Sequence, residues 1–179
     1  MRSLDQVLQD GIRDIQDYPQ AGVVFKDITP LLADHSGFTQ VVEALAASGR
    51  DADGNVVVDK VVGIEARGFI LAAPVALALG TGFVPVRKKG KLPSATFEES
   101  YALEYGEATI EVHQDAFAPG DRVLVIDDVL ATGGTVEACL RLVCRCGAEV
   151  VATSVLIDLS FLPWRERLAG ERVDTLVTV

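Results

Sequence analysis

The stretch VLVIDDVLATGGTVEA, residues 123–138, is the part of the sequence that most clearly indicates the fold class. Its first four residues are all apolar, which is typical of a strand covered on both faces of a sheet. Two acids follow, Asp127 and Asp128, and a loop of small residues then leads into a helix predicted from about Thr135 to Cys146. A buried strand that runs through a short loop into a helix is the repeating unit of an α/β protein.

Similar units precede and follow this stretch. Apolar spacing predicts helices over 4–15, from Ser36 to about Gly49, and over the stretch that ends at Leu79. Strands are predicted at 60–65, 83–89, 109–114 and 150–157, with 109–114 half-exposed because its apolar and polar residues alternate. Residues 17–30 are predicted to be a loop. We therefore predict an α/β fold with a central, mostly parallel sheet flanked by helices.

Length and charge set the limits of the function. A chain of 179 residues predicts a single domain, 1–179. The net charge of −10 argues against a nucleic-acid or anionic-membrane surface, which needs a basic footprint. The N-terminal segment contains acids and lacks an apolar core, and the apolar stretch 69–79 is too short to cross a bilayer. We expect a cytoplasmic protein.

The loop from Ala131 to Thr135, with Thr132, Gly133 and Gly134 between them, is suited to bind a phosphate. Glycines let backbone N–H groups approach an anion, and the N-terminus of a helix adds donors and partial positive charge. Asp127 and Asp128 can accept hydrogen bonds from the vicinal hydroxyls of a ribose. Lysine is missing for a Walker loop and the glycine spacing is wrong for a Rossmann loop. The alternative, a capped helix with a solvated acid pair, leaves two costly acids beside a buried strand.

This stretch resembles the 5-phosphoribosyl-1-pyrophosphate (PRPP) motif of the type I phosphoribosyltransferases. Three other segments resemble that family in the same order: YPQAGVVFKDITPLL (18–32), GIEARGF (63–69) and RKKGKLPSATFEESYALEYG (87–106). The resemblance covers about 17–168. It implies purine salvage, in which the phosphoribosyl group of PRPP is transferred to adenine to give AMP and diphosphate. It also implies a homodimer, and Mg²⁺ held through PRPP with no direct protein ligand.

Two segments are candidates for diphosphate binding. Arg67 can fork onto a diphosphate, or it can be a surface arginine beside a packing glycine. By resemblance, Glu65, Ala66 and Arg67 form the diphosphate loop, with a cis peptide bond between Glu65 and Ala66. The basic run that contains Arg87 and Lys88 is either a solvated loop or a clamp. The resemblance favours the clamp, implies that one of these two side chains reaches the partner's site, and makes Arg67 and Lys88 catalytic.

The connection 90–106 is long enough to be a lid that excludes water from the reacting centre. Glu104 on it is either a solvated acid or, as the resemblance implies, the group that shares a proton with purine N7. Tyr105 is expected to contact the diphosphate side.

Base recognition is expected in the N-terminal region, 1–35. Phe25, at a predicted turn, can stack on a purine or belong to the core. Backbone groups of Val24 and Lys26 can read the edge of adenine. The resemblance implies that Leu159, just past the predicted last strand of the sheet, covers the other face of the base.

Two alternatives stay open. An enzyme of the same family acting on 6-oxopurines is expected to carry a lysine and an aromatic residue in the late base-reading segment, but LIDLSFLPW (156–164) has no lysine. A non-catalytic PRPP or purine sensor that regulates transcription needs a DNA-binding module or a basic face.

Overall fold

The computed structural model describes residues 2–103 and 106–179. Their contacts group into two compact units, residues 1–44 and 45–179. That the whole chain behaves as one domain stays a prediction.

The first unit contains short helices and a two-stranded hairpin. Its elements are α1 (Leu4–Gly11), β1 (Arg13–Gln16), β2 (Val24–Asp27), α2 (Thr29–Ala33) and most of α3 (His35–Ala46). Ser3 caps α1, because its hydroxyl accepts the N–H of Gln6 at 3.2 Å. β1 and β2 pair antiparallel, with Ile15 opposite Phe25.

Three local predictions in this unit are wrong. The helix predicted over 4–15 ends at Gly11, because the residues after it pair with β2. The segment 17–30 is not all loop, since it contains β2 and the start of α2. Ser36 does not cap α3, which begins at His35; the carboxylate of Asp34 accepts the first free N–H groups instead.

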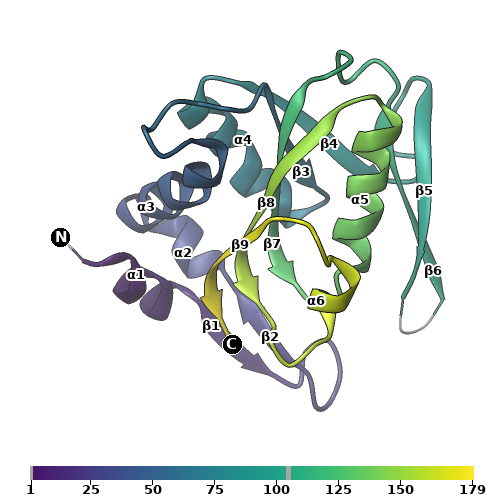
Figure 1. The fold of residues 1–179 in the computed structure, drawn as a ribbon. Helices are drawn as coiled ribbons and strands as arrows, with labels where there is room; N and C mark the ends of the chain where they lie inside the picture. Colours follow the sequence, from purple (N-terminus) through teal and green to yellow (C-terminus); the bar gives the residue numbers. More distant parts are fainter. Residues whose placement is uncertain (1, 104–105) are drawn as a thin grey trace. The chain divides into compact units, whose positions relative to one another are not determined.

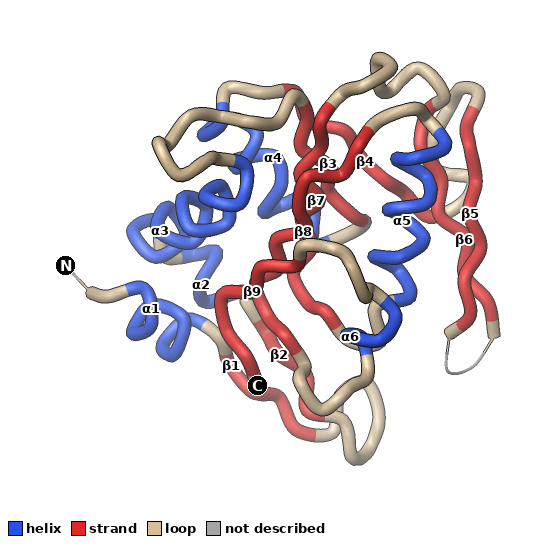
Figure 2. The backbone as a smooth tube through the Cα atoms, in the orientation of Figure 1, coloured by secondary structure: helices blue, strands red, loops and turns tan. Residues whose placement is uncertain are grey.

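The second unit is a sheet with helices on both faces (Figures 1 and 2). Its strands are β3 (Lys60–Ile64), β4 (Gly82–Lys88), β5 (Thr96–Ala102), β6 (Glu107–His113), β7 (Arg122–Leu130), β8 (Glu149–Asp158) and β9 (Val173–Thr178). Its helices are the 3₁₀ turn η1 (Ala47–Gly49), α4 (Arg67–Leu79), α5 (Gly134–Arg145) and α6 (Trp164–Arg167). The strand order is β5-β6-β4-β3-β7-β8-β9. Strands β4, β3, β7, β8 and β9 pair in parallel, and β6 pairs antiparallel with both of its neighbours, β4 and β5. The predicted fold class is confirmed.

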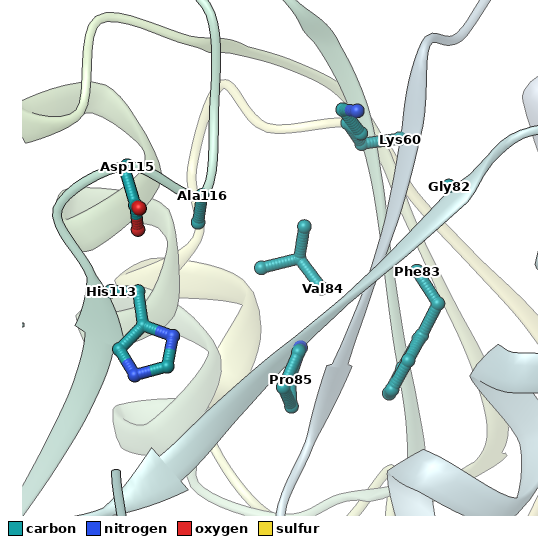
Figure 3. A pocket seen from close by; sticks show the side chains of 8 residues that line it. All are labelled: Lys60, Gly82, Phe83, Val84, Pro85, His113, Asp115 and Ala116. Atoms are coloured by element: carbon teal, nitrogen blue, oxygen red, sulfur yellow. The ribbon is translucent and has the colours of Figure 1, made fainter. Parts of the chain in front are cut away.

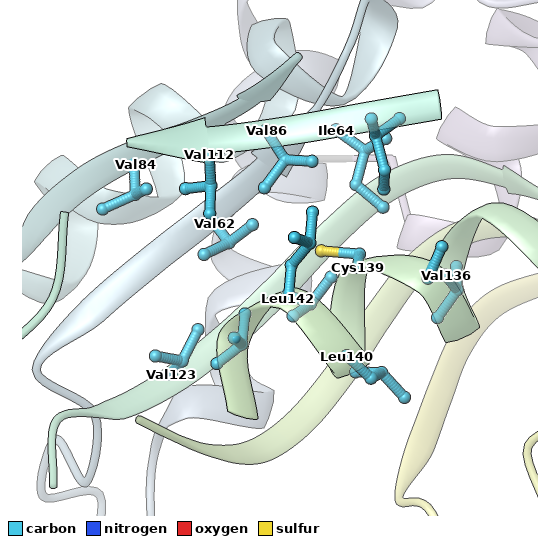
Figure 4. Close-up of a cluster of buried hydrophobic side chains, with 14 of the residues drawn as sticks. Val62, Ile64, Val84, Val86, Val112, Val123, Val136, Cys139, Leu140 and Leu142 are labelled. Atoms are coloured by element: carbon cyan, nitrogen blue, oxygen red, sulfur yellow. The ribbon is translucent and has the colours of Figure 1, made fainter. Parts of the chain in front are cut away.

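Strand β3 shows how the two faces are packed. Val62 and Ile64 belong to the buried cluster drawn in Figure 4, which includes Val136 and Cys139 of α5. Gly63 between them faces α4, since a Cβ there would lie 2.7 Å from the Cβ of Ala72. Alternation along the strand therefore places α4 and α5 on opposite faces of the sheet.

Several predictions in this unit need correction. The connection 90–106 contains strand β5, which forms a hairpin with β6. Strand β6 is not half-exposed, because Ile110, Glu111 and Val112 are all buried. Strand β8 is not the last strand, since β9 pairs beside it. None of the helices in the described ranges is long and apolar enough to cross a membrane.

Candidate functional site

The predicted site residues of the second unit gather at one edge of the sheet. Neighbouring strands β4, β3, β7 and β8 are parallel, so their carboxyl ends lie together. Lys88 ends β4, Glu65 follows β3, and Leu159 follows β8. This edge is where ligands bind in open α/β sheets.

The two acids lie within β7, which continues to Leu130 beyond its predicted end. Asp128 is buried, with 7% of its surface exposed, and its Oδ2 lies 2.6 Å from Nη2 of Arg67. Asp127 is half-buried, and its Oδ1 accepts the N–H of Asp128 at 2.9 Å. The acids therefore have different surroundings: Asp128 forms an ion pair with Arg67, and Asp127 accepts a backbone N–H group.

Asp127 is the acid whose ionisation is unfavourable. Burial raises its pKa well above the ordinary range, and the neighbouring charge of Asp128 raises it further. Hydrogen-bond donors from a ligand would favour the ionised form. The hydroxyl pair of a ribose supplies such donors.

Gly68 is a residue of this site that sequence reasoning treated only as packing. A Cβ at this position would lie 2.9 Å from Oδ1 of Asp127 and 3.1 Å from the carbonyl oxygen of Ile126. The first turn of α4 can therefore approach the end of β7 only with glycine at this position. The signal in the sequence is the Arg-Gly pair at the start of the helix.

The loop 131–135 surrounds a small cavity of about 70 Å³, lined also by Asp127 and Leu130. Helix α5 begins at Gly134, one residue before the predicted Thr135. Gly133 is its N-cap, with a left-handed φ of 79° and no side chain to take the first N–H groups of the helix. Those donors face the loop, as an anion site at a helix N-terminus requires.

A short helix supports this loop from behind. A Cβ on Gly133 would lie 3.2 Å from the Cβ of Trp164, the first residue of α6. The indole N–H of Trp164 donates to the buried carboxylate of Asp158 at 2.6 Å, and Arg165 donates to the same carboxylate at 2.8 Å. Sequence reasoning missed both Asp158 and Trp164, because their partners become neighbours only when α6 folds back.

The turn after β3 contains the cis peptide bond expected between Glu65 and Ala66. Arg67 follows as the first residue of α4. The carboxylate of Glu65 accepts the backbone N–H of Lys88 at 2.9 Å and Nε of Arg87 at 3.2 Å. The Glu65 side chain therefore holds the end of β4 in place.

The charge state of Glu65 follows from these contacts. Burial acts to raise its pKa, but the hydrogen bonds from Lys88 and Arg87 outweigh it and leave the pKa below its ordinary value. Glu65 is therefore ionised at neutral pH. Lys88 itself is exposed.

Three of the base-recognition candidates, Val24, Phe25 and Lys26, lie in the first unit. Phe25 is in strand β2 rather than at the predicted turn, and its ring meets that of Tyr18 edge to face, with centroids 5.2 Å apart. Val24 is exposed, and the ammonium of Lys26 lies 2.7 Å from Oδ1 of Asp14. The backbone groups of Val24 and Lys26 belong to a defined strand.

Asp27 at the end of this strand supports the hairpin. It accepts hydrogen bonds from the hydroxyl and the N–H of Thr29, and its Oδ2 lies 2.5 Å from Nη2 of Arg13. These contacts, with Thr29 first, lower its pKa from 3.8 to about 2. A carboxylate with a lowered folded-state pKa stabilises the fold above its unfolded pKa, and that contribution is lost as the pH falls through the folded value.

We predict that Asp27→Asn lowers the Tm at neutral pH. The difference from the wild type should narrow as the pH falls from about 4 toward 2, because the wild-type carboxyl is then protonated as well. Thermal unfolding across this pH range measures it. Thr29→Val, which removes one donor to Asp27, should reproduce part of the loss. A Tm difference between the two proteins that does not change with pH would contradict the stabilising role of the Asp27 charge.

Leu159 is half-buried, and its N–H donates to the carbonyl oxygen of Leu130 at 3.0 Å. This contact connects the residue to the start of the 131–135 loop. Glu104 and Tyr105, the remaining candidates, lie outside the described residues.

A separate cavity of about 230 Å³ lies at the amino ends of β3 and β4. Figure 3 shows Lys60 and Phe83 on one side of it, with His113 and Asp115 on the other. It contains none of the predicted site residues. The candidate site is therefore the edge formed by the carboxyl ends of the strands.

Comparisons with known proteins agree with this geometry. The model of the phosphoribosyl transferase domain matches residues 31–169. An adenine phosphoribosyltransferase of Nocardioides sp. is 66% identical over 168 residues, which cover 94% of this chain and 91% of that protein. The chain belongs to the adenine phosphoribosyltransferase family.

Solved structures of this family have the same fold. The enzyme from Rhodothermus marinus superimposes with a TM-score of 0.90 at 51% identity, over 98% of both chains. The Saccharomyces cerevisiae enzyme, solved in complex with adenine and an imino-altritol bisphosphate, superimposes with a TM-score of 0.92 at 35% identity, over 99% of this chain and 100% of that one. The resemblance drawn from the four sequence motifs is confirmed.

Proposed function

We propose that this chain transfers the 5-phosphoribosyl group of PRPP to adenine, giving AMP and diphosphate in purine salvage. The observation that carries the proposal is the end of β7, where Asp127 and the ion-paired Asp128 lead into a loop that opens α5 at a left-handed glycine. That arrangement supplies acceptors for two ribose hydroxyls beside donors for a phosphate. Base choice follows from the family's members, which are named for adenine.

In this mechanism the 131–135 loop anchors the 5′-phosphate, and Asp127 and Asp128 orient the ribose. Anchoring at both points holds the anomeric carbon in place, and orientation of this kind is worth several kcal/mol of the barrier. Leu159 and the strand around Phe25 are assigned to the two faces of the base.

The leaving diphosphate carries the charge that the protein must stabilise. Arg67, Arg87 and Lys88 are assigned to it, together with backbone groups of Glu65 and Ala66 and the side chain of Tyr105. Positive groups fixed where charge develops lower the barrier without reorganising during the reaction. Arg67 is already oriented by Asp128, 2.6 Å away.

Glu104 is assigned the proton exchange at purine N7. As N9 forms its bond to the anomeric carbon and the bond to diphosphate breaks, the purine becomes electron-poor; a carboxylate at Glu104 would accept the N7 proton and return it in the reverse reaction, which is general acid–base catalysis. The segment 90–106 is assigned the role of a lid, since PRPP hydrolyses if water reaches the activated anomeric carbon.

Mg²⁺ is proposed to enter with PRPP. Among the residues that the structure describes, no group of three or more His, Cys, Asp or Glu side chains could hold a metal. Asp128 is paired with Arg67, and Asp127 is hydrogen-bonded to backbone. These contacts fit an ion whose ligands are chiefly substrate oxygens, as is usual for Mg²⁺ on phosphates. Bound there, the ion would neutralise diphosphate charge.

A homodimer in the cytoplasm is also proposed. Helix α4 carries two exposed apolar side chains, Ile70 at 44% and Leu77 at 81% exposed, which supports burial against a second copy. Light scattering on the purified protein would measure the mass in solution, and a mass of one chain would contradict the dimer.

The function is tested by AMP formation from PRPP and Mg²⁺ with adenine, hypoxanthine or guanine as the acceptor. We expect AMP from adenine and little product from the 6-oxopurines. Product from hypoxanthine or guanine instead would agree with the assigned PRPP site but favour the 6-oxopurine alternative. No product from any base, with PRPP still bound, would favour a sensor.

A further inference from the structure

Glu111 is a buried acid that the proposed mechanism does not use. It lies in the middle of β6 and is 3% exposed. Its Oε1 accepts the backbone N–H groups of Lys91 and Leu92, both at 2.8 Å. A buried carboxylate is costly unless it is hydrogen-bonded, so these contacts explain how the charge is tolerated.

The hydrogen bonds also set the charge of Glu111. Burial acts to raise its pKa, but N–H donors of Leu92, Gly90 and Lys91 outweigh it and leave the pKa below its ordinary value. Glu111 is therefore a carboxylate at neutral pH. It holds three successive backbone groups of the turn that follows β4.

This turn is connected directly to Arg87. In the register of β4 and β6, Arg87 lies opposite Glu111. Nη1 of Arg87 donates to the carbonyl oxygen of Lys91 at 3.2 Å, while its Nε donates to Glu65 at 3.2 Å. One of the two acceptors that orient the guanidinium therefore belongs to the turn that Glu111 holds.

We propose that Glu111 is a positioning residue for diphosphate binding: its buried carboxylate fixes the turn 90–92, and the turn fixes the guanidinium of Arg87. This inference rests on the proposed function, which assigns Arg87 to the diphosphate. Glu111 need not contact the substrate. It acts on the site through the carbonyl group of Lys91, which accepts a hydrogen bond from Arg87.

The ligand pair for the test is inorganic pyrophosphate and AMP. AMP carries the 5′-phosphate, ribose and base but no diphosphate, so only pyrophosphate and PRPP depend on Arg87. Glu111→Ala is expected to raise the Kd of pyrophosphate about tenfold, which corresponds to the loss of one hydrogen bond to a charged group. The Kd of AMP should stay within about twofold of the wild-type value. Calorimetry in the presence of Mg²⁺ measures both.

Further variants distinguish the positioning of Arg87 from a non-specific disruption of the structure. Glu111→Gln keeps an oxygen that can accept both N–H groups, so it should restore pyrophosphate binding to within about threefold of the wild type. In an Arg87→Ala background, Glu111→Ala should weaken pyrophosphate binding no further, since residues acting through one contact are not additive. Glu99→Ala on β5 removes an acid paired with Arg141 at 2.7 Å and serves as the control, with both ligands bound as in the wild type.

The proposal is overturned if Glu111→Ala weakens AMP and pyrophosphate equally, or if its effect persists in full without Arg87. Should the alanine variant fail to fold, Glu111→Asp replaces it, because a carboxylate one methylene shorter cannot keep both contacts; unchanged pyrophosphate binding would then overturn the proposal. Wild-type protein that binds neither PRPP nor pyrophosphate would contradict the proposed function itself.

Discussion

Replacing Glu104 with glutamine is expected to lower kcat for AMP formation by about 100- to 10,000-fold, the usual contribution of a general acid or base. Glutamine is nearly the same size but cannot exchange a proton at neutral pH. The Kd of PRPP should change by no more than about threefold, because Glu104 is assigned to the base and not to PRPP. Single-turnover kinetics and equilibrium binding measure the two quantities separately.

Glu107→Gln is the matched control for that experiment. Glu107 is exposed at the start of β6, three positions further along the chain. It should keep wild-type turnover. Unchanged turnover in Glu104→Gln would contradict the proton-transfer role, and an equal loss in both variants would assign the effect to the net charge of this part of the chain.

Asp127→Asn should weaken ligand binding but stabilise the ligand-free protein. Losing the charged acceptor for a ribose hydroxyl is expected to weaken AMP and PRPP about 10- to 100-fold, since a hydrogen bond to a charged group contributes about 1.5–3 kcal/mol. The same change should raise the Tm of the ligand-free protein at neutral pH, because burial and Asp128 make the ionised form of Asp127 unfavourable.

The pH dependence gives the sign of this second effect. A carboxyl whose pKa is raised in the folded state costs stability when it is ionised above its unfolded pKa. The Tm gain of Asp127→Asn should therefore grow from acid to neutral pH and vanish where Asp127 is protonated in both states. Scanning calorimetry at several pH values, with AMP titrations beside it, measures both effects.

Asp128→Asn is the comparison for the stability effect. Its carboxylate is paired with Arg67 at 2.6 Å, so removing that charge should give no such gain. Wild-type AMP affinity in Asp127→Asn would contradict the ribose assignment, and equal Tm gains in both variants would contradict the distinction between the two acids.

Local patterns predicted the elements on which the site is built. The apolar run 123–126, followed by two acids and a pair of glycines, predicted β7, the loop 131–135 and α5 to within a few residues. The hairpin of β1 and β2 was missed because four-residue strands have too little periodicity to compete with a helical pattern. The exposure of β6 was mispredicted because its polar Glu111 is buried among backbone donors.

The fold class and the family could be predicted from the amino-acid sequence alone, because the residues that indicate them lie in contiguous stretches. The partners of the charged groups became known only from the tertiary structure: Arg67 pairs with Asp128, Glu65 pairs with Arg87, and Glu111 accepts backbone N–H groups of the turn 90–92. Strand order and register bring these partners together from distant segments. Local periodicity reports which face of an element is buried, but it contains no information about what lies across the sheet.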